Sequence, residues 1–318
     1  MQEKQKLFLI VGPTASGKTA VSIEIAKRMN AEIISADSIQ VYRGMDIGSA
    51  KPTMEERAGI PHHMLSIVAP DEPQFSVARF RELADQCIAD IAARGKRPLV
   101  VGGTGLYINA LIYPLSFADA PANPAVREKY AELETEQPGS AHRLLQTVDP
   151  VSAERLHPND KKRVIRALEV YELTGKPISE SGAGFSALDE EKLPYHPKIA
   201  GLTWPRDQLY ARIEQRVDDM MQQGLLDEVK ALCAEGYSPE FPAMQGLGYK
   251  QLVHYLNGAY TFPEAIDAIK RETRRFAKRQ ITWFKRDPRI RWYDVASYPD
   301  VSALADAIMA QFSEEGDG

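Results

Sequence analysis

The fold of this 318-residue chain is decided by the stretch LFLIVGPTASGKT, residues 7–19, in which an apolar run leads directly into the pattern G-x-x-x-x-G-K-T. Glycines in this pattern let the backbone curl so that successive N–H groups point inward, and the helix that follows offers its positive end to an anion. The lysine reaches the outer phosphates and the next hydroxyl holds Mg²⁺. The sequence therefore predicts a strand, a phosphate-binding loop and a helix. The predicted loop comprises Gly12, Pro13, Thr14, Ala15, Ser16, Gly17, Lys18 and Thr19, with Thr19 as the Mg²⁺ ligand.

Two further apolar runs predict neighbouring strands of a doubly wound α/β sheet. The run at residues 31–35 is followed by Asp37, and the run at residues 98–101 is followed by Gly102, Gly103 and Thr104. Ligands collect at the carboxyl ends of such strands, where a carboxylate can accept a proton. An Asx turn is an equally good interpretation of Asp37. Phosphate-loop proteins that hydrolyse nucleotides usually end a core strand with an aspartate, so the glycines and threonine here argue against ATP hydrolysis.

The composition is that of a globular protein. Hydrophobic residues make up 44% of the chain and charged residues 26%, which is ample for a large core. No apolar stretch approaches the roughly 20 residues that span a bilayer, and the first residues lack the apolar core of a signal peptide. Cys87 and Cys233 lie far apart with no C-x-x-C spacing, which argues against a disulfide framework or a zinc knuckle. We expect a cytoplasmic protein that makes no contact with a membrane.

From about residue 117 to residue 195, the sequence consists of helical patterns interrupted by prolines. The clearest helix there is expected over residues 161–173, and Gly175 and Pro177 end it. We therefore expect a phosphate-loop parallel sheet flanked by helices, formed by residues 1–116 and 199–318. An inserted all-helical domain is expected over residues 117–198.

The net charge of −5 hides a basic block at residues 270–291, where ten Lys or Arg stand against Glu272 and Asp287. Such a block is often only a solvated helix face. Trp283 and Phe284 lie within it, however, and aromatic rings among arginines can stack bases while the guanidinium groups hold phosphates. This pattern favours contact with a polyanion.

Seven segments together resemble the tRNA dimethylallyltransferase family, also called tRNA delta(2)-isopentenylpyrophosphate transferases, of the bacterial type. They are GPTASGKT (12–19), ISADSIQVYRGMDIGSAKP (34–52), VVGGTGLY (100–107), HPNDKKRVIRALEVY (157–171), RIEQRVDDM (212–220), GLGYKQ (246–251) and AKRQITWFK (277–285). The resemblance implies transfer of a dimethylallyl group from dimethylallyl diphosphate to N6 of the adenosine 3′-adjacent to the anticodon. It also implies that the reaction releases diphosphate and needs Mg²⁺.

The resemblance also implies roles for individual residues. Lys18 and Arg216 would clamp the diphosphate, Asp37 would take the proton from the adenine amine, and Thr104 would lie near the reacting centre. It implies that the anticodon stem-loop of tRNA contacts four segments and two single residues. These are Asp37, Ser38, Ile39 and Gln40; Lys162, Arg163, Val164, Ile165 and Arg166; Gln245, Gly246, Leu247, Gly248, Tyr249 and Lys250; Lys278, Arg279, Gln280, Ile281, Thr282, Trp283, Phe284 and Lys285; and Thr104 and Arg127 beside the modified base.

Three alternatives use the same phosphate loop. An adenylate isopentenyltransferase shares the core chemistry and acts on AMP, ADP or ATP, but it does not need an extended basic surface. A small-molecule kinase predicts tight ATP binding, but it does not explain the block at residues 270–291. A non-catalytic RNA-binding switch would retain RNA binding without prenylation. The expected protein is a monomeric prenyltransferase.

Overall fold

The computed structural model describes residues 4–72, 75–113, 122–180 and 193–314. The chain divides into two compact units, of which the first comprises Met1–Ile112 with Tyr195–Gly318 and the second comprises Tyr113–Pro194. The second unit thus interrupts the first, with boundaries four residues before the expected 117 and 198.

The first unit contains a six-stranded sheet in the order β3-β2-β4-β1-β5-β6, in which all pairings are parallel. The strands are β1 Lys6–Val11, β2 Ala31–Ser35, β3 His62–His63, β4 Arg97–Gly102, β5 His196–Thr203 and β6 Arg291–Asp294. The central strands are apolar along their length because helices cover both faces of a parallel sheet. This architecture confirms the predicted α/β fold.

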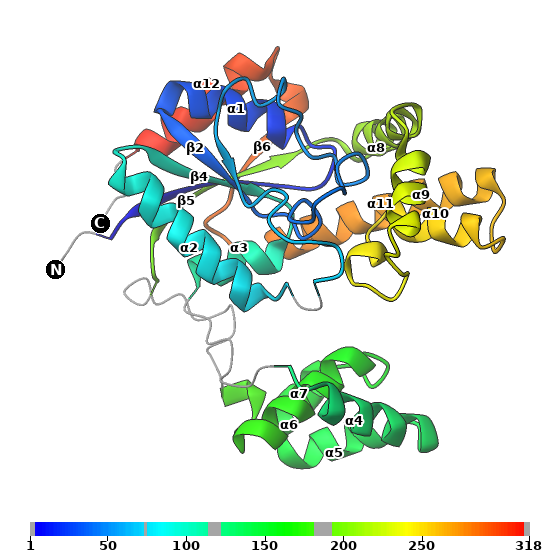
Figure 1. The fold of residues 1–318 in the computed structure, drawn as a ribbon. Coiled ribbons are helices and arrows are strands. Elements are labelled where there is room, and N and C mark those ends of the chain that lie inside the picture. The colour runs from blue at the N-terminus through cyan, green and yellow to red at the C-terminus, as the bar shows by residue number, and fades with distance from the viewer. Residues whose placement is uncertain (1–3, 73–74, 114–121, 181–192, 315–318) are drawn as a thin grey trace. The chain divides into compact units, whose positions relative to one another are not determined.

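Two pairs of helices cover the faces of the sheet (Figure 1). Helices α1 (Lys18–Met29) and α12 (Val301–Ser313) lie on one face, and α2 (Val77–Ala93) and α3 (Gly105–Ile112) lie on the other. On the first face Phe8 of β1 contacts Phe312 of α12, with 5.1 Å between the ring centroids. These layers fix the strands so that the loops at their carboxyl ends meet at one edge.

A second apolar core of the same unit lies among helices beside the sheet. These helices are α8 (Arg206–Gln222), α9 (Leu225–Ala234), α10 (Tyr249–Leu256) and α11 (Phe262–Phe284). The long α11 begins at a capping box, in which Thr261 and Glu264 satisfy each other's backbone N–H groups. Short 3₁₀ turns occur at η3 (Ala243–Gln245) and η4 (Val295–Ser297).

The described part of the second unit is helical. It contains α4 (Pro124–Glu136), α5 (Ser140–Val148), α6 (Pro150–Arg155), α7 (Lys161–Thr174) and the 3₁₀ turn η1 (Ile178–Glu180). The helix expected over residues 161–173 is confirmed as α7. The unit has its own core, in which Leu145 and Leu168 are buried. Across the described residues of both units, no helix has the length and apolarity needed to cross a membrane.

Candidate active site

The phosphate loop connects β1 to α1 and has the backbone that its glycines permit. Gly17 has a φ of 91°, in the left-handed region, where a side chain would be strained. At Gly12 a Cβ atom would lie 2.6 Å from the carbonyl oxygen of Leu202, so β5 leaves no room for a side chain. The Nζ of Lys18 donates to the carbonyl oxygens of Gly12 (3.0 Å) and Pro13 (2.7 Å). The lysine therefore folds back over the loop.

Two cations and one carboxylate are coupled electrostatically at this loop. Burial and, to a lesser extent, the positive charge of Arg216 lower the pKa of Lys18 to about 7, and the negative charge of Asp37 opposes the shift. Burial likewise lowers the pKa of Arg216, which belongs to α8. No described residue forms a hydrogen bond or ion pair with the Arg216 guanidinium group. Desolvated cations that a carboxylate compensates only in part favour a bound anion.

Asp37 and Thr104 leave the carboxyl ends of β2 and β4 and are joined through Ser38. The Oδ1 atom of Asp37 accepts from the backbone N–H of Ile39 (2.9 Å) and Gln40 (3.3 Å), which confirms the Asx-turn interpretation. No described residue donates to Oδ2, so this oxygen can accept a proton. Thr104 Oγ1 accepts from the N–H of Ser38 at 3.1 Å. The turn therefore orients the carboxylate without consuming both of its oxygens.

The residues present fit the Mg²⁺ that the loop implies. Thr19 is exposed in the first turn of α1, and its hydroxyl forms no hydrogen bond with a described residue. Among the described residues, no group of three Asp, Glu, His or Cys side chains can hold a metal ion. Mg²⁺ commonly takes one or two protein ligands and completes its shell with phosphate oxygens and water. Thr19 suits that arrangement.

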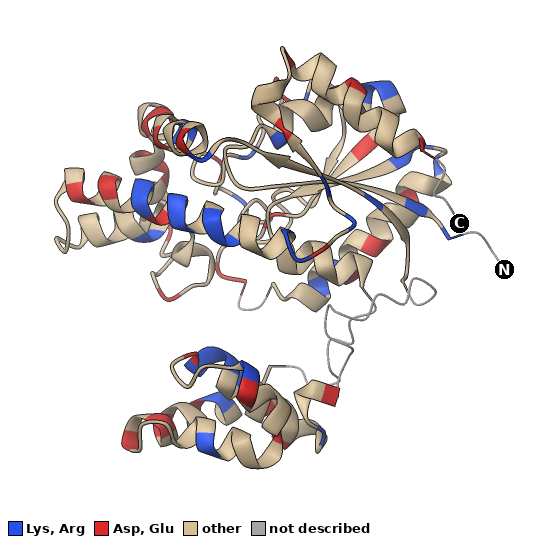
Figure 2. Ribbon diagram, turned by 180° about the vertical axis from the view of Figure 1, so that it is seen from behind, with Lys and Arg blue, Asp and Glu red and all other residues tan. Residues whose placement is uncertain are grey.

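The basic block divides into two parts along α11, whose successive turns carry Lys and Arg (Figure 2). In the first part, Lys270 pairs with Asp218 of α8 at 2.7 Å, and Arg274 pairs with Glu214 of α8. In the second part, Lys278 and Lys285 are exposed and form no ion pair with a described residue. Arg271 and Arg275 are also exposed but pair with Glu272 of the same helix, so the exposed cations of α11 differ in how far they are compensated.

Several of the residues expected to face RNA have side chains or Cα atoms that are buried. These residues do not reach the surface of the protein, and their direct contact with RNA stays a prediction. The buried members are Val164, Gly246, Gly248, Tyr249, Gln280 and Phe284. Gln40 also has a local role, since its side chain joins Ser35 to the carbonyl oxygens of Ser49 and Ala50. The exposed members include Lys162, Arg163, Gln245, Lys250, Lys278, Arg279, Thr282 and Lys285.

In the second unit one buried carboxylate holds two of the expected RNA contacts. Glu169 accepts from Arg127 at 2.9 Å, from Arg166 at 2.6 Å and from the backbone N–H of Asn123 at 2.6 Å. The Glu169 side chain is fully buried, whereas those of Arg127 and Arg166 are 46% and 33% exposed. The carboxylate therefore fixes two partly exposed guanidinium groups from α4 and α7.

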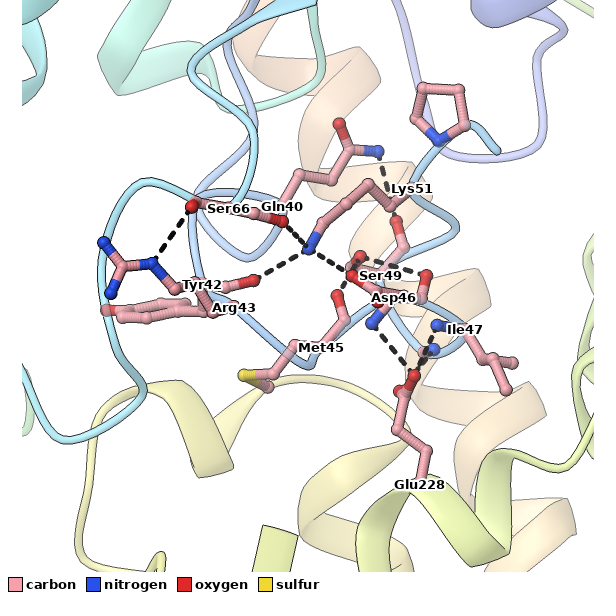
Figure 3. A network of polar contacts seen from close by, with 12 residues as sticks. Gln40, Tyr42, Arg43, Met45, Asp46, Ile47, Ser49, Lys51, Ser66 and Glu228 are labelled. Atoms are coloured by element: carbon pink, nitrogen blue, oxygen red, sulfur yellow. Dashed lines mark hydrogen bonds and ion pairs between the residues drawn. The ribbon is translucent and has the colours of Figure 1, made fainter. Parts of the chain in front are cut away.

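Two residues that sequence reasoning missed organise the segment after β2 (Figure 3). Glu228 of α9 accepts from the backbone N–H groups of Asp46 (2.9 Å), Ile47 (2.7 Å) and Gly48 (3.1 Å). Lys51 is buried and donates to Tyr42 O, Asp46 Oδ1 and Ser66 Oγ. No local sequence pattern indicates the role of Glu228, because its partners lie about 180 positions away in the chain. The network fixes the loop that begins at Asp37.

A parallel sheet whose first strand enters a lysine-bearing glycine loop, beside a desolvated arginine, defines a P-loop α/β protein with an anion site. The family profile described as IPP transferase matches residues 40–287. The chain therefore belongs to the IPP transferase family. A second profile, described as isopentenyl transferase, matches residues 5–66 and so includes the phosphate loop.

Known proteins resemble the chain over nearly its full length. It is 49% identical to the tRNA dimethylallyltransferase of Pelotomaculum thermopropionicum, over 96% of each chain. The crystal structure of a tRNA delta(2)-isopentenylpyrophosphate transferase from Staphylococcus epidermidis is similar with a TM-score of 0.73 and 42% identity, over 98% of this chain and all of that one. A eukaryotic dimethylallyltransferase acting on tRNA is similar with a TM-score of 0.81 and 33% identity, over 96% of this chain and 78% of that one. These similarities confirm the resemblance inferred from the sequence.

Proposed function

We propose that this protein transfers a dimethylallyl group from dimethylallyl diphosphate to N6 of the adenosine 3′-adjacent to the anticodon of tRNA. The observation that carries the proposal is the phosphate loop with Lys18 and Arg216 beside the Asp37 carboxylate. Anion-binding groups and a proton acceptor at one edge suit alkyl transfer with a diphosphate leaving group. Membership of the IPP transferase family supports the same reaction.

In the proposed reaction, the lone pair of the adenine amine forms a bond to C1 of the allyl group. The bond from C1 to oxygen breaks, and diphosphate leaves with the electron pair. Backbone N–H groups of the loop, Lys18 and Arg216 stabilise the charge that develops on the diphosphate. The amine loses a proton, which Asp37 is positioned to accept at Oδ2. Mg²⁺, held by Thr19, would supply further charge stabilisation to the diphosphate.

The adenine must leave the stacked anticodon loop to reach such a site. The exposed cations at the end of α11, together with the arginines on Glu169, are the proposed contacts to the RNA. We propose that the enzyme acts as a monomer, since one chain can supply all groups of the proposed chemical step. Its tRNA substrate makes the cytoplasm the proposed location.

The test is to incubate the protein and Mg²⁺ with labelled dimethylallyl diphosphate and either unmodified tRNA or AMP. Digestion should then show label on N6 of adenosine from tRNA alone. Label on AMP would instead indicate an adenylate isopentenyltransferase. Phosphate transfer from ATP would indicate a kinase, and RNA binding without label would indicate a switch.

A further inference from the structure

Gln280 of α11 lies buried between two loops of the candidate active site, with a side chain only 6% exposed. Its Oε1 atom accepts from the backbone N–H of Thr14 in the phosphate loop at 2.9 Å. Its Nε2 atom donates to the carbonyl oxygen of Gly103, the residue before Thr104, at 2.9 Å. One amide group thus joins the loop after β1 to the loop after β4.

Two glycines that follow β4 leave the space that side chains of α11 occupy. A Cβ atom at Gly103 would lie 2.3 Å from Nε2 of Gln280, and one at Gly105 would lie 2.2 Å from the indole of Trp283. The VVGGTG sequence therefore has glycines where α11 approaches the loop backbone closely. On the other side of this contact, Ala277 of α11 packs with Ala15 of the phosphate loop.

The bonds of Gln280 extend to the proposed proton acceptor. Gly103 is followed by Thr104, whose Oγ1 accepts from the N–H of Ser38 beside Asp37. Gln280 is therefore the link by which the phosphate loop is held against the Thr104–Asp37 pair. The same helix carries exposed cations at Lys278 and Lys285 on its opposite face. An RNA bound to that face shares one rigid helix with both loops.

We propose that Gln280 is a positioning residue, not an RNA contact: it fixes the phosphate loop relative to Asp37 and Thr104, and so aligns the diphosphate with the attacking amine. The proposal deepens the proposed function and rests on it for its kinetic part. A misplacement of about 1 Å can lower a rate by about 100-fold. The expected effect of losing the amide is therefore on the chemical step and not on the binding of either substrate.

The test compares Gln280→Met, which keeps the shape and removes both hydrogen bonds, with Gln280→Glu, which can still accept from Thr14 but cannot donate to Gly103 as a carboxylate. The matched control is Gln311→Met. Gln311 is also buried and also bridges two groups, Tyr293 Oη and Ile199 O, but it lies in α12 on the sheet face. Hydrogen exchange of the peptide spanning the phosphate loop is measured without substrates, and kcat and KM are measured with tRNA.

Gln280→Met should speed exchange of the Thr14 amide and lower kcat by about 10- to 100-fold, with each KM within about threefold of wild type. For Gln280→Glu, both the exchange rate and kcat should lie between those of Gln280→Met and the wild type. Gln311→Met should change neither the exchange rate nor kcat. Unchanged loop exchange, or a wild-type kcat in either Gln280 variant, would overturn the proposal. A wild-type protein that transfers no label refutes the proposed function, whereas the exchange measurement still decides the role of Gln280.

Discussion

At the scale of single residues, the candidate site contains two cations, Lys18 and Arg216, whose charged forms are destabilised by burial. Lys18 is half-buried and lies near the positive charge of Arg216, whereas the negative charge of Asp37 partly compensates it. A diphosphate would supply the missing negative charge. The site therefore holds cations at a cost that binding of an anion would relieve.

Replacing Asp37 by Asn separates its two roles. The Asn side chain keeps the oxygen that caps Ile39 and Gln40, so the turn should persist, but an amide cannot take the proton of the amine. We expect kcat to fall by about 100-fold or more, the contribution typical of general-base catalysis. Affinity for tRNA should stay within threefold. An Asp37→Asn enzyme with wild-type kcat, compared with an Asp227→Asn control on the exposed surface of α9, would remove Asp37 from the mechanism.

The lowered pKa of Lys18 predicts that the protein takes up a proton when it binds diphosphate. Its pKa is about 7 in the folded protein, so the side chain is mostly neutral at pH 8, and a bound diphosphate should restore its proton. Calorimetry at pH 8 in buffers of different ionisation enthalpy should therefore show uptake approaching one proton per diphosphate bound, relative to Lys18→Arg. Arginine keeps the charge at all accessible pH values. Equal proton uptake by the two proteins would contradict this assignment.

The sign of the stability effect follows from the same pKa. The unfolded lysine titrates near 10.5, so between about pH 7 and 10.5 the unfolded chain binds more protons than the folded one. The contribution of Lys18 to the free energy of unfolding therefore rises with pH across this window. Below pH 7 both states hold the proton and the contribution is constant.

At the scale of elements, α11 has one face that packs against the candidate site and another that carries exposed cations. Its buried face meets the phosphate loop and the β4 loop through Ala277 and Gln280. Lys270 and Arg274 are paired with carboxylates of α8, which fixes the two helices to each other. The exposed cations lie further along the helix, beside the site. The helix thus joins the proposed RNA-binding surface to the candidate active site.

Neutralising the exposed cations of α11 should weaken RNA binding in a salt-dependent way. With Lys278, Arg279 and Lys285 changed to Gln, we expect the slope of log affinity against log salt to fall by about 2, since each lost phosphate contact removes roughly 0.7 to 0.9. The control changes Lys27, Arg97 and Lys198, which lie toward the amino edge of the sheet. Equal slopes in the two triple variants would show that the α11 cations do not contact RNA.

At the scale of the whole molecule, the second unit is inserted between β4 and β5 of the sheet and has a separate core. Separate cores allow one unit to be destabilised while the other keeps its structure. The proposed diphosphate groups all belong to the first unit, whereas Arg127 and Arg166 belong to the second. The two substrates therefore depend on the two units to different extents.

Substitutions that create a cavity in the core of one unit or the other test whether the two units act separately. Leu168→Ala in the second unit and Leu304→Ala in the first each remove a buried side chain, at an expected cost of about 2–5 kcal/mol to the unit concerned. We expect Leu168→Ala to weaken tRNA binding and leave the affinity for inorganic diphosphate unchanged. Leu304→Ala should lower the thermal stability of the first unit. Loss of diphosphate binding in Leu168→Ala would show that the units do not act separately.

The phosphate loop, the parallel α/β class, the helix expected over residues 161–173 and the concentration of basic charge could all be predicted from the sequence alone. These features are local: a glycine loop needs its glycines in order, and helix periodicity is set by neighbours along the chain. Tertiary packing determines which cations of α11 are paired, that Tyr249 and Gln280 are buried, and that Glu228 holds the loop at residues 46–48. Gln280 and Thr14 lie 266 positions apart, so their hydrogen bond depends on the packing of α11 against the sheet and on no local pattern.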